Sequence, residues 1–130
     1  GSGFVVKYIS EISLLISPYI SPIGGSYIKL PKRLEKSKSI INIQNKNDEY
    51  CFVYNLILFK NRSKFLKSPN LHRTSNYTPL LNKYISFLKS YGIKKYPVSI
   101  EDLKKYNKEV YQNPNLPFVN VFSADNLGNL

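Results

Sequence analysis

The pattern of hydrophobic and polar positions changes most sharply in the middle of the first half of the chain. A short apolar run, Ser39 to Ile43, predicts a buried strand, and the polar residues Gln44 to Glu49 predict a turn after it. Hydrophobic residues then occupy nearly every position from Tyr50 to Lys60. Because a helix that is apolar nearly all round is buried on all sides, we predict a central core helix at Tyr50–Lys60.

Helical spacing of apolar residues marks two further segments. Pro79 opens a helix that we expect to run to about Ser90, and Gly92 follows as a C-terminal stop. Ser99 and Asp102 form a capping-box pattern, which predicts a helix from there to about Val110. Weaker patterns predict extended structure at Phe4–Ile16, a short strand or extended arm at Tyr27–Leu30, a short helix at Pro31–Glu35, a basic loop at Asn61–Leu71, a helical turn at Arg73–Tyr77 and a strand at Phe118–Phe122.

Together these elements predict an α+β fold, in which a helical lobe surrounds the central helix and short strands lie near Ile41 and Val119. A chain of 130 residues suffices for one domain with one core. We expect an N-terminal arm at 4–38, a core at 39–122 and a polar tail at 123–130. Residues 1–3, Gly-Ser-Gly, have the composition of a cloning remnant.

The composition excludes several classes of protein. Hydrophobic residues make up 42% of the chain and aromatic residues 14%, which is too rich for a disordered chain. No apolar run approaches the ~20 residues of a membrane span. The single cysteine allows no internal disulfide, so we expect an intracellular protein of the cytoplasm or nucleus. No Cys/His cluster or phosphate-binding loop is present, so we expect neither a metal nor a cofactor.

Positive charge is the strongest feature of the composition. The chain has 19 Lys and Arg against 8 Asp and Glu, a net charge of +11, which favours association with nucleic acid or acidic proteins. Only three of these cations are Arg, while Lys, Asn, Ile and Tyr are abundant, so the charge can equally reflect an AT-rich coding sequence and a solvated surface. The candidate anion- or partner-binding residues lie in or beside the predicted basic loop: Lys60, Arg62, Lys64, Lys67 and Arg73.

One combination of residues suggests chemistry. Cys51 stands at the first turn of the predicted central helix, six positions after Asn45, and Gln44 precedes Asn45. A helix N-terminus favours a thiolate, and an upstream amide can donate a hydrogen bond to an oxyanion. This order is typical of papain-like cysteine peptidases. The alternative interpretation, that Cys51 is a small core residue, remains open. The only histidine, His72, lies in a loop, where a surface role is expected rather than that of a catalytic base.

Several short motifs resemble, in the same order, a domain of Maverick/Polinton-type transposon proteins that is similar to the papain-like deubiquitinases related to herpesviral large tegument proteins. The motifs are Gly25–Pro31, Ile41–Asn45 with Asp48, Cys51 and Phe52, Asn70–Tyr77, Gly92–Ile93, Tyr96–Val98 and Val119–Phe122. The resemblance implies that Cys51 matches the nucleophile and that Asn45 or Gln44 matches the oxyanion amide. In that family the catalytic histidine follows the strand matched by Val119–Phe122.

The sequence continues for only eight residues after Phe122, and none of them is histidine. The resemblance therefore implies a truncated or degenerate peptidase domain with weak or no catalysis, which retains binding of a ubiquitin-like or other protein partner. Two alternatives remain. One is a basic nucleic-acid-binding accessory domain of a mobile element, and the other is an interaction or effector protein without chemistry.

Overall fold

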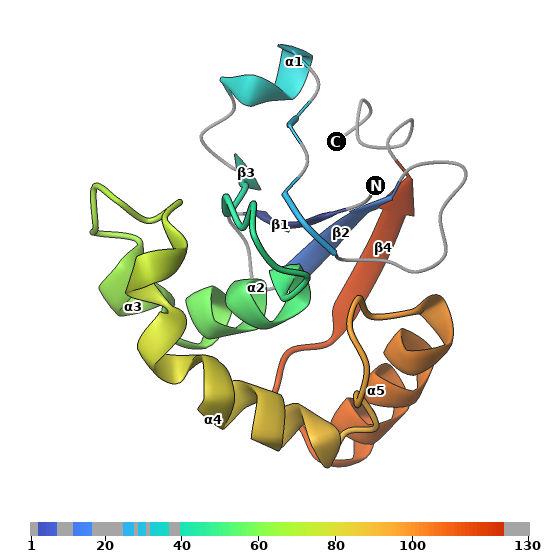
Figure 1. The fold of residues 1–130 in the computed structure, drawn as a ribbon. Coiled ribbons are helices and arrows are strands. Elements are labelled where there is room, and N and C mark those ends of the chain that lie inside the picture. The colour runs from blue at the N-terminus through green and yellow to red at the C-terminus, as the bar shows by residue number, and fades with distance from the viewer. Residues whose placement is uncertain are drawn as a thin grey trace.

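The computed structural model describes residues 3–7, 12–16, 25–27, 29–30, 32–36 and 40–123 (Figure 1). The helices are α1 (Lys32–Glu35), α2 (Cys51–Lys60), α3 (Arg62–Phe65), the 3-10 turn η1 (Thr74–Asn76), α4 (Thr78–Lys89) and α5 (Ile100–Gln112). The strands are β1 (Gly3–Lys7), β2 (Ile12–Ile16), β3 (Ile40–Ile41) and β4 (Val119–Ser123). The predicted helix start at Pro31, the tail after Ser123 and the first two residues of the predicted cloning remnant lie outside the described residues.

The four strands form one sheet in the order β3-β1-β2-β4. β1 pairs antiparallel with both β2 and β3, whereas β2 and β4 run parallel, with Ile12 opposite Val119. Extended structure was predicted for Phe4–Ile16, and this segment supplies the two central strands rather than a separate arm. Helices and strands are both present, as predicted, and helical residues outnumber strand residues among those described.

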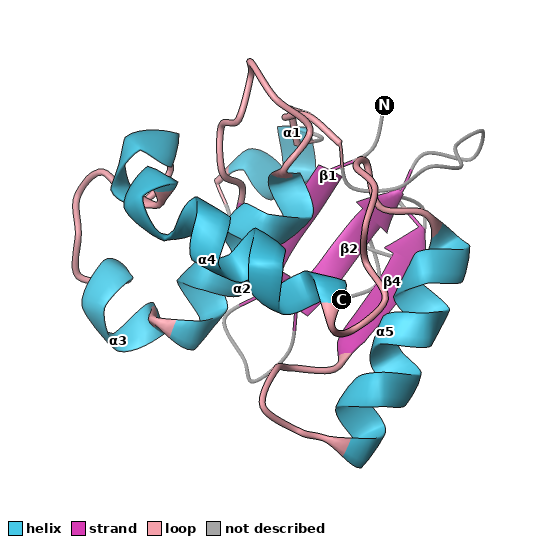
Figure 2. Cartoon of the chain, turned by 60° about the horizontal axis from the view of Figure 1, so that its bottom comes forward, coloured by secondary structure: helices cyan, strands magenta, loops and turns pink. Residues whose placement is uncertain are grey.

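Helix α2 lies between the sheet and α4, as Figure 2 shows. All nine residues from Cys51 to Phe59 are buried, so the predicted core helix is confirmed. Its Phe52 ring meets the Tyr106 ring of α5 edge-on, with 5.4 Å between the centroids. Edge-to-face contact of this kind adds to the free energy gained by burial. The core therefore forms around α2, where it meets the sheet, α4 and α5.

The two amphipathic helices follow the predicted pattern. On α5 the inward residues Leu103, Tyr106 and Val110 are buried, and the Asp102 amide donates to Ser99 Oγ over 3.1 Å, which confirms the cap. α4 ends at Lys89, and Gly92 adopts φ +89° shortly after it. This left-handed conformation suits glycine because it has no Cβ.

The predicted loop at Asn61–Leu71 is wrong in its first half, where α3 forms a helical turn. Phe65 is buried, and its ring lies 4.7 Å from the Tyr77 ring, centroid to centroid. Burial of one aromatic side chain supplies stabilisation that the polar residues around it do not predict. Phe65 thus anchors the predicted basic loop, Asn61–Leu71, to the core.

Candidate functional site

The sulfur of Cys51 is not presented to solvent. Cys51 is 1% exposed, and Asn55 Nδ2 lies 3.6 Å from its Sγ. The backbone N–H groups of Tyr50 and Cys51, at the start of the helix, are already hydrogen-bonded within the protein. The Cys51 amide donates to the Gly25 carbonyl over 3.2 Å, and the Tyr50 amide donates to Asp48 Oδ1 over 2.9 Å. In this arrangement the sulfur has no open path to a substrate carbonyl.

Asn45 lies beside the start of α2, and its side chain is bonded to protein groups. Its Nδ2 donates to the Gly25 carbonyl over 3.0 Å and to Asp48 Oδ1 over 3.0 Å. The amide of Cys51 donates to the same Gly25 carbonyl. The residue is 1% exposed, and its Oδ1 has no hydrogen-bond partner among the described residues. The N–H groups that an oxyanion would need are therefore already engaged.

Gln44 lies in a different place from the sulfur. It is exposed, and its backbone amide donates to the His72 carbonyl over 2.9 Å. His72 is also exposed, as expected, and its Nδ1 lies 3.3 Å from the Asn42 carbonyl oxygen. Gln44 and His72 line an open hollow whose lining includes neither Cys51 nor Asn45. Gln44 is thus exposed at the hollow, whereas the other two predicted catalytic residues, Asn45 and Cys51, are buried outside its lining.

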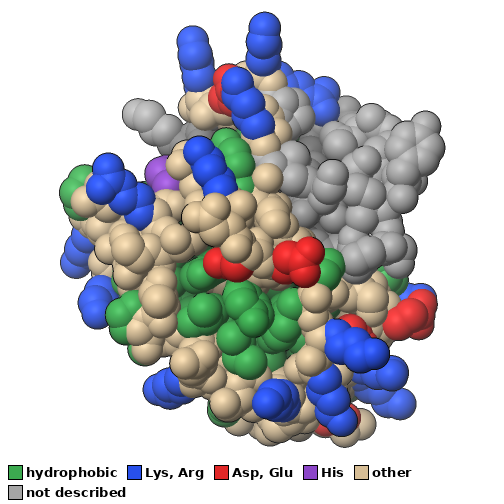
Figure 3. Space-filling view, in the orientation of Figure 1, with side chains coloured by type: hydrophobic (Ala, Val, Ile, Leu, Met, Phe, Trp, Pro, Cys, Tyr) green, Lys and Arg blue, Asp and Glu red, His purple; other side chains and the backbone are tan. Residues whose placement is uncertain are grey.

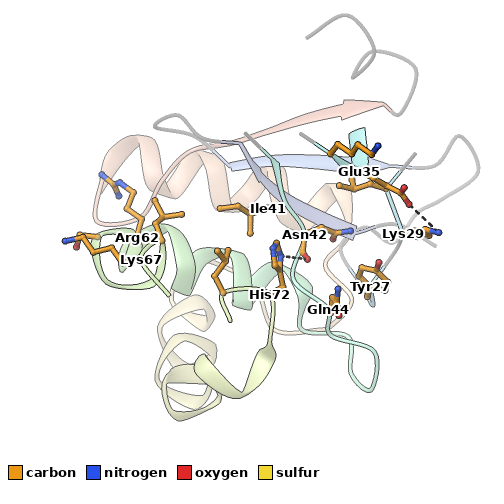
Figure 4. A pocket seen from close by; sticks show the side chains of 14 residues that line it. Tyr27, Lys29, Glu35, Ile41, Asn42, Gln44, Arg62, Lys67 and His72 are labelled. Atoms are coloured by element: carbon orange, nitrogen blue, oxygen red, sulfur yellow. Dashed lines mark hydrogen bonds and ion pairs between the residues drawn. The ribbon is translucent and has the colours of Figure 1, made fainter. Parts of the chain in front are cut away.

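This hollow, of about 880 Å³, is the candidate site supported by the described residues. Three chain segments line it: the stretch before and around α1, the stretch after β3, and α3 with the loop behind it (Figure 4). Its cationic lining residues are Lys29, Lys36, Arg62 and Lys67, and its other lining residues are Tyr27, Leu30, Glu35, Ile41, Asn42, Gln44, Ser63, Leu66, Leu71 and His72.

Positive charge dominates the hollow. Lys29 Nζ lies 3.3 Å from Glu35 Oε1, so one cation is paired. Among the described residues, no ion pair joins Lys36, Arg62 or Lys67 to an acid. Arg62 is held in place because its Nη1 donates to the Phe59 carbonyl over 2.8 Å. Figure 3 shows the chain's one histidine among Lys and Arg side chains on this part of the surface. Such a surface attracts anions.

Only two of the five predicted binding cations, Arg62 and Lys67, lie in the hollow. Lys60 instead donates to the Asn115 carbonyl over 2.7 Å, beside a smaller cavity. Lys64 lies over the Phe65 ring. The hollow includes neither Lys64 nor Arg73.

Sequence reasoning missed Lys29, Lys36 and Tyr27 as site residues, and it gave Gln44 a different role. No local pattern marks these residues. They meet in the hollow only because segments distant in the sequence lie side by side. Their shared position could therefore be found only from the fold.

No protein-family model, curated protein or solved structure matches this chain. Within the described residues, no helix is both long and apolar enough to span a membrane. The same residues contain no group of three or more His, Cys, Asp or Glu side chains that could hold a metal ion.

Proposed function

We propose that this chain is a non-catalytic domain that binds nucleic acid through the hollow. The observation that carries the proposal is the lining of the hollow, which has a volume of about 880 Å³ and contains four cationic side chains but only one acidic side chain. The closed surroundings of Cys51 support the non-catalytic part, because its sulfur is 1% exposed and the N–H groups nearby are engaged.

The kind of cation indicates the kind of binding. Three of the four lining cations are Lys, which acts as a point charge, and only Arg62 offers a planar fork for bidentate recognition. Contacts of this kind neutralise phosphates and do not read base sequence. The proposal is therefore for binding that depends strongly on salt and weakly on sequence. An acidic protein segment is the competing ligand.

The test is fluorescence anisotropy with a labelled oligonucleotide, titrated with salt. The double variant Lys36→Glu/Lys67→Glu should bind at least roughly 10-fold more weakly at low salt, and its log–log salt slope should fall by about 2. The matched control is Lys105→Glu/Lys108→Glu on α5, which changes the net charge equally on exposed positions outside the hollow. It should lose much less affinity.

Two outcomes would overturn this proposal. One is the absence of binding even at low salt. The other is an equal loss of affinity in both double variants, which would show that only the total charge matters.

A second candidate function is that of a degenerate papain-like domain that binds a ubiquitin-like protein. The observation that favours it is the convergence of the Asn45 side chain and the Cys51 amide on the Gly25 carbonyl, at the start of a buried central helix. This order of amide, turn and helix is the one expected for the helical lobe of such a fold.

Reaction of Cys51 with iodoacetamide and with ubiquitin-propargylamide tests this candidate. We expect native Cys51 to react more slowly than glutathione at neutral pH and to react at the rate of a model thiol in urea, because unfolding exposes the sulfur. Rapid labelling of the native chain by ubiquitin-propargylamide would instead identify an active peptidase and overturn the non-catalytic proposal. Absence of any ubiquitin-induced NMR shifts would remove ubiquitin as a partner.

A further inference from the structure

We infer that the hollow selects single-stranded over double-stranded nucleic acid, with Tyr27 as the platform on which a base stacks. The inference rests on the proposed function and names its ligand more closely. The observation behind the inference is that three segments distant in the sequence bring an aromatic ring, side-chain amides and cations to the lining of one hollow.

Backbone hydrogen bonds link the segments that line the hollow. The stretch that holds Asn42 and Gln44 is bonded to both of the other lining segments. On one side the Tyr27 amide donates to the Asn45 carbonyl over 3.2 Å, and on the other the Gln44 amide donates to the His72 carbonyl over 2.9 Å. The neighbouring Ser26 Oγ donates to the Asp48 carbonyl over 2.8 Å. The backbone that carries Tyr27 is thus fixed before any ligand arrives, which lowers the entropic cost of binding.

Cations and neutral groups are distributed along the hollow in a way that suits a single strand. Figure 4 shows Arg62 and Lys67 at one end and Lys29 at the other. Between them lies His72, and Tyr27 lies on the Lys29 side. A single strand offers phosphates along its backbone and bases that can turn outward, so phosphates can reach the cations while a base meets the ring.

Tyr27 has the features of a stacking platform. Its side chain is partly exposed at the hollow, and Lys46 Nζ lies over one face of its ring, 5.7 Å from the centroid. A base would stack on the opposite face, with the Lys46 cation close to the bound nucleotide. Duplex DNA keeps its bases stacked on one another and could offer only phosphates here. An acidic peptide would engage the cations but has no base to place on the ring.

The volume agrees with a ligand of this size. About 880 Å³ lies in the upper part of the range of roughly 300–1,000 Å³ that is usual for ligand-binding clefts. The hollow is open to solvent rather than enclosed, so an extended strand can enter it. A short piece of an extended strand fits these features better than a small free anion does.

The experiment compares four labelled ligands by anisotropy: a 12-nucleotide oligo-thymidine, an abasic strand of the same length and charge, a duplex and a poly-glutamate. Wild-type protein should bind oligo-thymidine at least about 10-fold more tightly than the abasic strand. Tyr27→Leu should remove most of that difference and leave abasic binding unchanged, whereas Tyr27→Phe should retain it. Tyr111→Leu is the matched control, since Tyr111 is 85% exposed on α5.

The two proposals fail in different ways. If no nucleic acid binds, the proposed function fails. If oligo-thymidine, abasic strand and duplex bind equally and all depend on Lys36 and Lys67, the proposed function stands and the selection of single strands is overturned. Tighter binding of poly-glutamate than of oligo-thymidine would identify an acidic protein partner and overturn both.

A strand carrying 5-iodouracil, photo-crosslinked to the wild-type protein, should give an adduct at Tyr27, so the inference stays testable even if Tyr27→Leu does not fold.

Discussion

Asn45 and Asp48 meet side chain to side chain at the entrance to α2, with 3.0 Å between Asn45 Nδ2 and Asp48 Oδ1. The same carboxylate accepts the Tyr50 amide over 2.9 Å and, through Oδ2, the Tyr54 hydroxyl over 2.8 Å. One acid thus ties the turn before α2 to the first turns of the helix. It also satisfies an amide at the start of the helix that would otherwise lack a partner.

Replacing Asp48 with Ala should destabilise the protein by about 2–3 kcal/mol, because three hydrogen bonds to the carboxylate are lost and their donors remain partly buried. Urea denaturation monitored by circular dichroism measures this. Glu49→Ala is the matched control, since it removes an exposed acid at the next position, and it should change stability by less than roughly 0.5 kcal/mol. Equal effects of the two substitutions would contradict the role given to Asp48.

Buried tyrosines should make stability fall in alkaline solution. Burial raises the pKa of Tyr77 to about 12, and burial also raises the pKa of Tyr106 and, together with the hydrogen bond to Asp48, that of Tyr54. The unfolded chain releases these protons near pH 10, before the folded chain does. The contribution of these tyrosines to stability should therefore be unchanged up to about pH 9.5 and fall above pH 10, by up to about 1.4 kcal/mol per pH unit for each such group.

Urea unfolding at pH values from 8 to 11.5 tests this slope. Tyr77→Phe keeps the ring beside Phe65 and removes one titrating hydroxyl, so its stability should fall less steeply above pH 10 than that of the wild type. An unchanged slope in Tyr77→Phe would mean that this hydroxyl does not titrate differently in the two states.

Gly92 should not tolerate a side chain. Its φ of +89° is strained for any residue with a Cβ, so Gly92→Ala should cost about 1 kcal/mol or more. Gly25→Ala is the matched control, because its backbone is not in the left-handed region and a Cβ there would meet Pro97 at an ordinary 3.5 Å. Thermal unfolding of both variants should show a lower Tm only for Gly92→Ala.

The sequence predicts those elements whose stabilisation is local or whose apolar pattern is strong. α2 is buried on all sides, as its nearly continuous apolar run indicates, and α5 begins at the capping Ser99. α3 was missed because its stability comes from the contact between Phe65 and Tyr77, which no pattern in the segment reveals. Short segments of this kind are decided by tertiary packing.

The site was harder to predict than the fold. The order Asn45, turn, Cys51 suggested an exposed nucleophile, but the sequence could not indicate that the Gly25 carbonyl and the Asp48 carboxylate close the start of α2. The hollow depends on Tyr27 lying close to Gln44 across the hydrogen bond to Asn45. Contacts between segments so far apart depend on the whole fold.

The parallel pairing of β2 with β4, which sets Ile12 opposite Val119, has a consequence for how the protein is made. On the ribosome, β2 emerges long before β4, so the hairpin of β1 and β2 keeps the β4-pairing edge of β2 open until late in synthesis. The sheet is complete only when β4, at the end of the described chain, has left the exit tunnel. Contacts of such long sequence separation slow folding, so we expect chaperones to encounter this hairpin during synthesis.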